Sequence, residues 1–152
     1  MITIRKINID ELHKLITYDE LDISFKKQCD SNNNKEYFAV IDGDKVLGHA
    51  LVFMFHNISI AQINEIYILP QERKQGLGDG LLRTVFNYLR IHLFNRTIIK
   101  NHKELGNFLI NKGIKEIDFQ NLSENIKSIL KNDYKDQYYI CNIEEFFKRK
   151  CC

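Results

Sequence analysis

One stretch, NEIYILPQERKQGLGDGLL (Asn64–Leu82), constrains the fold more than any other part of the sequence. An apolar, strand-like run meets the only proline of the chain, and a charged turn follows. Glycines then stand at positions 76, 78 and 80, ahead of leucines at helical spacing. Because glycine allows backbone conformations that other residues avoid, this pattern predicts a strand that passes through a tight turn into a helix.

The segment from Arg73 to Gly78 has the features of an anion site. A helix start leaves backbone N–H groups without intrahelical partners and carries partial positive charge. Glycines let an anion approach those groups, and Arg73 and Lys74 add full charges. Asp79 and Gly80 follow where a Walker A loop needs Lys and Ser/Thr, and the glycine spacing differs from the dinucleotide fingerprint. The alternative is a glycine-rich helix start that only packs on the sheet.

The remaining periodicities predict one α+β domain, since 152 residues fit a single core. Antiparallel strands come first and a βαβ crossover follows, so we expect one mixed sheet. Strands are expected at 2–7, 36–41, 45–55, 58–69, 97–100, 115–119 and 137–143. Helices are expected after an Asn8 cap, around 21–29, from 77 to about 94, around 105–109 before Gly113, and around 126–130 after a Ser123 cap. The Asp42-Gly43-Asp44 turn indicates a hairpin, and residues 144–152 form either a short helix or a frayed tail.

Charge and composition exclude several classes of function. The net charge is +2 and both signs are mixed along the chain, which argues against a nucleic-acid-binding surface. No apolar run approaches the roughly 20 residues of a membrane span, and the N-terminus lacks a signal-peptide pattern, so we expect a cytoplasmic protein. The four cysteines lack zinc spacing, and His49 and His56 are interpreted as packing or surface residues. No metal is expected.

The segment Glu65–Leu82 resembles the signature of the GNAT acetyltransferase superfamily. That signature is a strand ending in an apolar-aromatic-apolar triplet, often a proline, and then Arg/Gln-x-x-Gly-x-Gly/Ala at the start of a long helix. Arg73, Gly76 and Gly78 stand at its three defining positions. The resemblance implies a GNAT-like single domain over residues 1–152. Its sheet would be mixed and mostly antiparallel, with helices on both faces and a central splayed strand.

The same resemblance implies that acetyl-CoA is the co-substrate. In the family the loop amides hold the CoA pyrophosphate, and the exposed backbone of the splayed strand pairs with the pantetheine arm as a further strand would. On this chain the pyrophosphate would lie at Arg73, Lys74, Gln75, Gly76, Leu77, Gly78 and Asp79, and the arm along Ile66, Tyr67 and Ile68. The carboxylate of Asp79 is expected to point away from the phosphates.

Acetyl transfer requires that the amine lose a proton and that the thioester carbonyl be polarised. Glu65 is the candidate base, acting directly or through a water. The alternatives are that Glu65 pairs with a neighbouring Arg or Lys, or faces solvent. Asn64 is expected on the other face, where it would orient a water. By family analogy a backbone N–H of Ile66 or Ile68 is the carbonyl partner.

The general acid is where the sequence departs from the family. Leu109 stands where many members carry a tyrosine that protonates the leaving thiolate. Asn101 lies one residue from the position of the family asparagine, and is a candidate for the cofactor site. His102 is a further candidate for the acid, as are Tyr138 and Tyr139 on the last strand.

We therefore predict an N-acetyltransferase that acts on a primary amine of a small molecule or protein by direct attack in a ternary complex. The alternative is a catalytically weak or inactive module that binds CoA or acyl-CoA as a sensor or interaction domain. The acidic cluster Tyr18–Asp22 either attracts a cationic amine or is a solvated helix start. The acceptor is not readable from the sequence, and a homodimer is left open.

Overall fold

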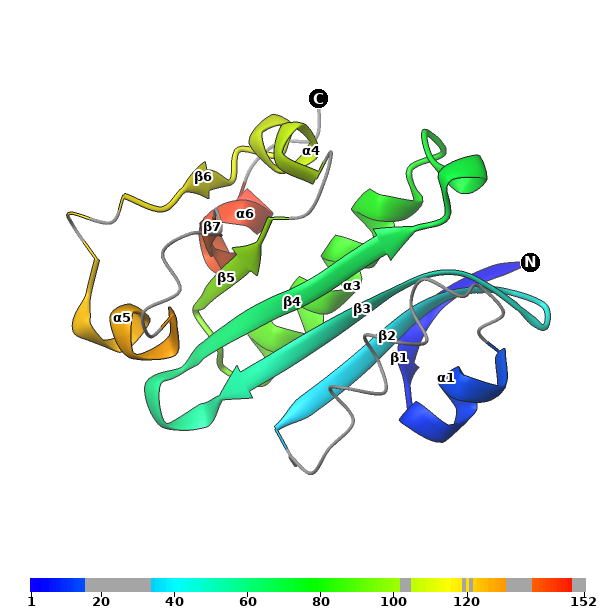
Figure 1. Ribbon diagram of the computed structural model, residues 1–152, viewed down its shortest axis with the longest axis horizontal. Coiled ribbons are helices and arrows are strands. Elements are labelled where there is room, and N and C mark those ends of the chain that lie inside the picture. Colours follow the sequence, from blue (N-terminus) through cyan, green and yellow to red (C-terminus); the bar gives the residue numbers. More distant parts are fainter. Residues whose placement is uncertain (16–33, 102–104, 119, 121, 131–137, 149–152) are drawn as a thin grey trace.

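The computed structural model describes residues 1–15, 34–101, 105–118, 120, 122–130 and 138–148 (Figure 1). Within those residues one seven-stranded sheet has the order β1-β2-β3-β4-β5-β7-β6. Neighbouring strands are antiparallel except β4 and β5, which are parallel. This is the mixed, mostly antiparallel sheet that the sequence predicts. The strands are β1 (Ile2–Ile7), β2 (Lys35–Asp42), β3 (Lys45–Phe55), β4 (Ile60–Ile68), β5 (Arg96–Lys100), β6 (Lys115–Glu116) and β7 (Tyr138–Asn142).

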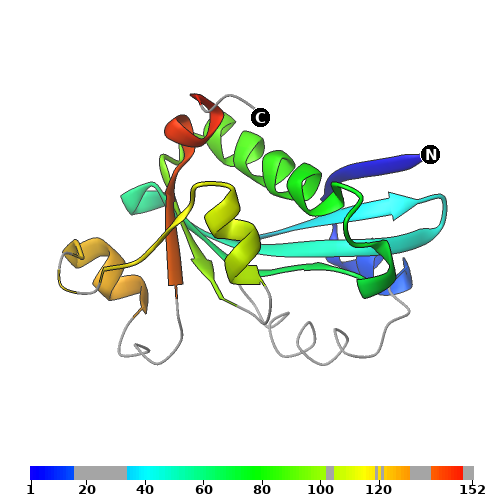
Figure 2. The ribbon, with the colours of Figure 1, turned by 90° about the horizontal axis from the view of Figure 1, so that it is seen from above.

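Helices cover both faces of the sheet, as expected. In Figure 2 α3 and α6 lie on one side of it and α1 on the other. The apolar residues of α5 cluster with Ile60, Ile98 and Tyr138, on the face that α3 does not cover. The helices are α1 (Ile9–Leu15), α3 (Leu77–Ile91), α4 (Leu105–Asn111), α5 (Glu124–Leu130) and α6 (Ile143–Lys148), with 3-10 turns η1 (His56–Ile58) and η2 (Pro70–Glu72). No described helix is long and apolar enough to cross a membrane.

Helix ends follow the capping residues that the sequence offers. The Asn8 Oδ1 atom accepts the backbone N–H of Glu11 at 2.8 Å, and the Ser123 hydroxyl oxygen accepts that of Ile126 at 3.4 Å. Gly113, at φ +77, ends α4 in the left-handed conformation of a C′ residue. Gly43, at φ +63, turns β2 into β3. These four predictions are confirmed, because each rests on local chemistry that tertiary contacts do not override.

The helix α3 anchors the main core. Its buried residues repeat at helical spacing: Leu77, Leu81, Leu82, Val85, Phe86 and Leu89. Burial of each such side chain contributes about 1.5–3 kcal/mol. A Cβ atom at Gly80 would come within 2.7 Å of the Ile4 Cδ1 atom, so the third glycine of the turn allows α3 to pack closely on β1. A Cβ atom at Gly78 would lie 3.9 Å from the Ile68 Cγ1 atom, so the N-terminus of α3 lies beside the end of β4.

The parallel strands β4 and β5 separate halfway along β4. They pair only over Ile60–Ile63, whereas β4 stays paired with β3 up to Ile68. This is the splayed strand that the sequence analogy predicts. Val52 lies opposite Ile63 and Leu51 opposite Glu65, so Asn64 is the extra residue of a β-bulge.

Three boundaries differ from the expected ones by two residues or more, and several others by one residue. The helix α3 ends at Ile91 rather than near residue 94, because Leu93 adopts a left-handed conformation at φ +68. The strand β4 starts after η1 instead of at Ile58. The strand β6 covers only Lys115–Glu116 of the expected 115–119. The helix expected around 21–29 and the cluster Tyr18–Asp22 lie outside the described residues.

Candidate functional site

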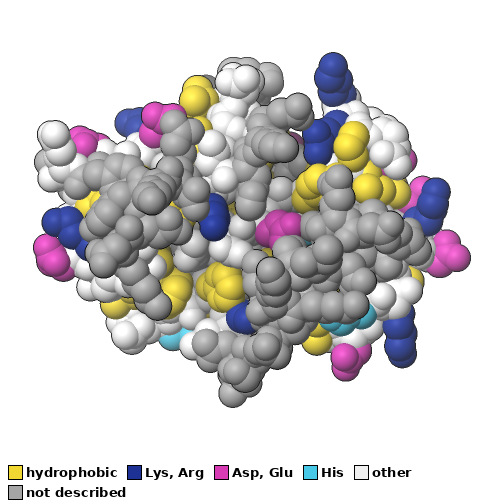
Figure 3. Space-filling view, in the orientation of Figure 1, with side chains coloured by type: hydrophobic (Ala, Val, Ile, Leu, Met, Phe, Trp, Pro, Cys, Tyr) yellow, Lys and Arg dark blue, Asp and Glu magenta, His cyan; other side chains and the backbone are white. Residues whose placement is uncertain are grey.

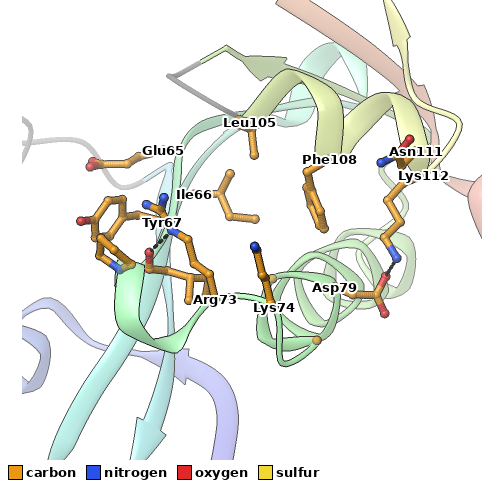
Figure 4. A pocket seen from close by; sticks show the side chains of 14 residues that line it. Glu65, Ile66, Tyr67, Arg73, Lys74, Asp79, Leu105, Phe108, Asn111 and Lys112 are labelled. Atoms are coloured by element: carbon orange, nitrogen blue, oxygen red, sulfur yellow. Dashed lines mark hydrogen bonds and ion pairs between the residues drawn. The ribbon is translucent and has the colours of Figure 1, made fainter.

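A pocket of about 880 Å³ lies between the free half of β4, the turn that follows it and α4 (Figure 4). Its volume is within the range of small-molecule and cofactor sites. The lining residues come from two separate stretches of the sequence, 65–79 and 105–112. They are Glu65, Ile66, Tyr67 and Ile68 of β4, Pro70, Arg73, Lys74, Gly76, Gly78 and Asp79 of the turn and α3, and Leu105, Phe108, Asn111 and Lys112 at α4.

The backbone of β4 offers hydrogen-bonding groups to this pocket. The N–H of Leu69 donates to the carbonyl of Leu47 on β3 at 2.9 Å. Because backbone groups of successive strand residues point to opposite edges, those of Tyr67 face β3 and those of Ile66 and Ile68 face the open edge. Of the three residues predicted to pair with a pantetheine arm, Ile66 and Ile68 therefore have the suitable orientation.

The turn after β4 presents the start of α3 to the same pocket. Gly76 is the N-cap of α3 at φ +82, a conformation that L residues rarely adopt, and no side chain caps the helix there. The next three N–H groups, from Leu77 to Asp79, belong to the helix start, which lacks intrahelical partners. A Cβ atom at Gly78 would meet Phe108 at an ordinary contact distance of 3.6 Å. Glycine is therefore more strongly required at position 76, where φ is positive, than at position 78.

The basic side chains of the turn lie on the β4 side of the pocket. The Arg73 Nε atom donates to the Ile68 carbonyl at 2.8 Å, and its guanidinium carbon is 5.4 Å from the centre of the Tyr67 ring. Figure 4 shows the Lys74 side chain extending into the space between β4 and α4. Gln75, also predicted at the cofactor site, is not among the lining residues, and the Leu77 side chain is buried in the core.

Asp79 links the start of α3 to the end of α4. One carboxylate oxygen lies 2.8 Å from Lys112 Nζ, and the other accepts a hydrogen bond from Arg83 Nε at 2.9 Å. Burial raises the pKa of Asp79, but the bonds to Lys112 and Arg83 lower it more, so the net shift is downward. The carboxylate is therefore ionised at neutral pH and engaged by two cations.

Glu65 lines the pocket, and 14% of its side chain is exposed. Its Oε1 atom is 3.4 Å from Nε2 of His49, a fully buried residue of β3. The sequence interpretation offered only an Arg or Lys partner or solvent, and took His49 for a packing residue. Asn64, the bulge residue, is not among the lining residues. Ile63 and Ile66 both lie in the main core, so side chains do not simply alternate across the bulge. The prediction that Asn64 lies on the opposite sheet face from Glu65 assumed such alternation.

The α4 side of the pocket was not predicted. Leu105, Phe108, Asn111 and Lys112 line it, whereas Leu109 is fully buried in the core. The spacing of Leu105, Phe108 and Lys112 is that of one helix face, so a helical projection of 105–112 would have found this face. The aromatic ring that α4 turns to the pocket is thus Phe108.

Three other candidates lie away from the pocket lining. Tyr139 is buried, and burial together with the nearby Glu116 carboxylate raises the pKa of its phenol. Asn101 directly follows β5, and both it and Tyr139 approach Gly106 of α4. Tyr138 packs on the opposite face with α5, and His102 lies outside the described residues.

The face shown in Figure 3 carries charged side chains of both signs. Lys/Arg and Asp/Glu side chains are interspersed around the face in Figure 3. Among the described residues no group of three or more His, Cys, Asp or Glu could hold a metal ion. The chemistry that the pocket supports is recognition of an extended, amide-containing, anionic molecule next to the carboxylate of Glu65.

Comparison with known proteins gives a consistent result. Residues 3–108 match the acetyltransferase (GNAT) family. A GNAT-family acetyltransferase from Staphylococcus aureus Mu50 has a TM-score of 0.72 at 16% identity, covering 94% of this chain and 99% of that chain. The PaiA N-acetyltransferase of Thermoplasma acidophilum, solved with coenzyme A, has a TM-score of 0.66 at 16% identity, with 93% and 99% covered. The N-acetylglutamate synthase of Neisseria gonorrhoeae, solved with coenzyme A and N-acetyl-glutamate, has a TM-score of 0.67 at 13% identity, with 94% and 35% covered. A comparison with curated protein sequences gave no match.

Proposed function

This chain belongs to the acetyltransferase (GNAT) family, and from that premise we propose that it transfers an acetyl group from acetyl-CoA to a primary amine of a small molecule or protein. One observation carries the proposal: the free edge of β4 and the glycine-rich start of α3 line the same pocket. Two structural relatives were solved with coenzyme A, which supports the choice of co-substrate. A cytoplasmic location stays a prediction from the sequence.

The pocket fits the parts of acetyl-CoA in order. The amides from Lys74 to Asp79 would hold the pyrophosphate, helped by the charge of Arg73 and Lys74. The backbone groups of Ile66 and Ile68 would pair with the pantetheine amides, as in the addition of a strand to a sheet edge. The apolar surface of Phe108 on the opposite wall would cover the arm.

The transfer itself needs few groups from the protein. Glu65 would take a proton from the ammonium form of the acceptor, directly or through a water that Asn64 orients. The neutral nitrogen then attacks the thioester carbonyl carbon, while the N–H of Ile66 or Ile68 stabilises the developing oxyanion. The new C–N bond forms, the C–S bond breaks, and the thiolate leaves and takes up a proton. The acetylated nitrogen releases its remaining surplus proton to the departing thiolate or to solvent, and Glu65 returns its own proton to solvent before the next turnover.

The residues of α4 support a second candidate function, because none of those described at the pocket replaces the family tyrosine. Leu109 is buried where many family members have a tyrosine, and the pocket-facing Phe108 cannot donate a proton. This favours, as the alternative, a module that binds CoA or acyl-CoA with little or no turnover and acts as a sensor or interaction domain.

Thermal unfolding with acetyl-CoA tests both candidate functions, and an assay of thiol release distinguishes them. At a hundred times its dissociation constant a ligand stabilises the native state by about 2.7 kcal/mol, which raises the melting temperature of a chain of this size by roughly 5–10 °C. Absence of any shift would contradict both functions. Release of free thiol across a panel of primary amines supports the enzyme, and a thermal shift without thiol release supports the binding module.

A further inference from the structure

His49 is a fully buried histidine placed directly behind a pocket carboxylate. Its Nε2 atom is 3.4 Å from Oε1 of Glu65, which itself lines the pocket. Glu65 contributes to the pocket lining, and Figure 4 shows its carboxylate directed away from Leu105 and Phe108. A buried polar ring costs free energy unless it interacts with a suitable partner, so histidine in the otherwise apolar strand β3 requires a reason.

The β-bulge creates this pair. On one side of the bulge Val52 lies opposite Ile63. Without the extra residue, Leu51 would lie opposite Asn64, and Ala50 would lie opposite Glu65. Side chains alternate between sheet faces, so Glu65 would then point to the face of Ala50, in the core beneath α3. The extra residue instead places Glu65 opposite Leu51, on the same face as His49 and one diagonal step away from it.

The described ionisable side chains on the same sheet face as His49 include one carboxylic acid and two tyrosines. Tyr67 lies opposite it on β4, with ring centres 6.0 Å apart, and the Arg73 guanidinium lies over the Tyr67 ring. On β2 the partner of His49 is Ala39, and Tyr37 lies in the same cluster. Glu65 is therefore the carboxylate that these described neighbours bring to the ring.

We propose that His49 is a positioning residue for Glu65. The buried Nε2 atom lies next to Oε1, and an N–H donor there would stabilise the ionised carboxylate. The distance of 3.4 Å exceeds that of a closed N–H···O bond, so the contact is a close electrostatic one. The catalytic consequence rests on the proposed role of Glu65 as the base, whereas the pairing itself does not.

The pairing is tested by NMR without any activity. Long-range ¹⁵N spectra of the wild-type protein should show His49 protonated at Nε2 at neutral pH. ¹³C-carboxyl titration should show that His49→Met raises the Glu65 midpoint by about one pH unit, since the polar group beside the charged carboxylate is lost. His49→Gln retains an N–H donor and should restore the wild-type midpoint. His56→Met is the matched control, because this exposed histidine packs on Phe94 beyond the other end of β3.

Kinetics then test the consequence. His49→Met should lower kcat by about 10–100-fold with an unchanged KM for acetyl-CoA, and move the acidic limb of the rate profile to higher pH. His49→Gln should recover most of kcat, and His56→Met should match wild type. A Glu65 midpoint that is equal in wild type and His49→Met, or a wild-type ring protonated only at Nδ1, overturns the pairing. A shifted midpoint in a protein that acetylates no amine would sink the proposed function and leave the pairing standing.

Discussion

Replacing Gly76 by alanine tests whether the turn after β4 binds the co-substrate or only joins a strand to a helix. Gly76 has φ +82 and ψ 4, and a Cβ atom there would meet no atom within 4 Å. Alanine therefore adds a backbone cost of about 1–2 kcal/mol without a steric clash. At about 2–4 °C for each kcal/mol in a chain of this size, the melting temperature should fall by about 2–8 °C.

Gly43 provides a matched control. It has φ +63 in the turn between β2 and β3, a Cβ atom there would also meet nothing within 4 Å, and it is not among the pocket-lining residues. Gly43→Ala should therefore lose a similar amount of stability. Only Gly76→Ala should also weaken acetyl-CoA binding. If the alanine variant relaxes its turn to avoid the left-handed conformation, ligand binding must return the turn to that conformation. This step costs the same 1–2 kcal/mol, which corresponds to about 5–30-fold in affinity.

The measurement is calorimetric titration of both variants with acetyl-CoA, beside their melting curves without ligand. Two results together would refute the reasoning: equal losses of melting temperature and equal, wild-type affinities. In that case Gly76 serves the turn alone, and the co-substrate does not use the conformation of the loop.

Three further variants address separate parts of the site. Glu65→Gln keeps the shape of the side chain but cannot accept a proton, so kcat should fall by about 10²–10⁴ while calorimetric acetyl-CoA affinity stays unchanged; an unchanged kcat would rule out the base. Asp79→Asn removes the ion pair to Lys112 and should cost about 0.5–1 kcal/mol in urea unfolding at pH 7. The pKa of Asp79 is lowered in the folded state, so this difference should be present above its unfolded value of 3.8 and vanish as pH falls through the folded value; a difference that grows in acid would contradict the sign. Phe108→Tyr puts a hydroxyl in the pocket and should change kcat by less than about tenfold; a larger gain would mean that thiolate departure needs an acid.

The parts of the fold that the sequence predicts well are those set by neighbouring residues. The stripe of α3 repeats over four turns, and the glycine turn and the Asn8 cap need only local geometry. Because the strand before the turn must deliver the chain to the helix start, the location of the pocket along Ile66–Gly78 also followed from the sequence.

What the sequence did not reveal depends on register and on contacts between distant residues. The bulge at Asn64 shifts the alternation of β4, and the adjacent polar pair Asn64 and Glu65 between Ile63 and Ile66 marks this shift in the sequence. That pair does not show which of the two residues is the extra one, so the register across to β3 was not predicted. The pairing of Glu65 with His49 depends on that bulge. The ion pair between Asp79 and Lys112 joins residues far apart in the chain, and only the packing of α4 beside α3 brings them together.

The buried Leu109 bears on the speed of the reaction more than on its possibility. A thiol of ordinary acidity, with a pKa near 8.5, leaves as a thiolate with little need for a proton, whereas an alkyl ammonium group has a pKa near 10.4. At pH 7 roughly one such amine in 2,500 is neutral and able to attack. Formation of the nucleophile is therefore the more demanding proton transfer, and the proposed mechanism assigns it to Glu65 rather than to α4. Loss of a tyrosine at the leaving group consequently predicts a turnover that depends on pH through the amine and Glu65, and the His49 contact acts on that same step.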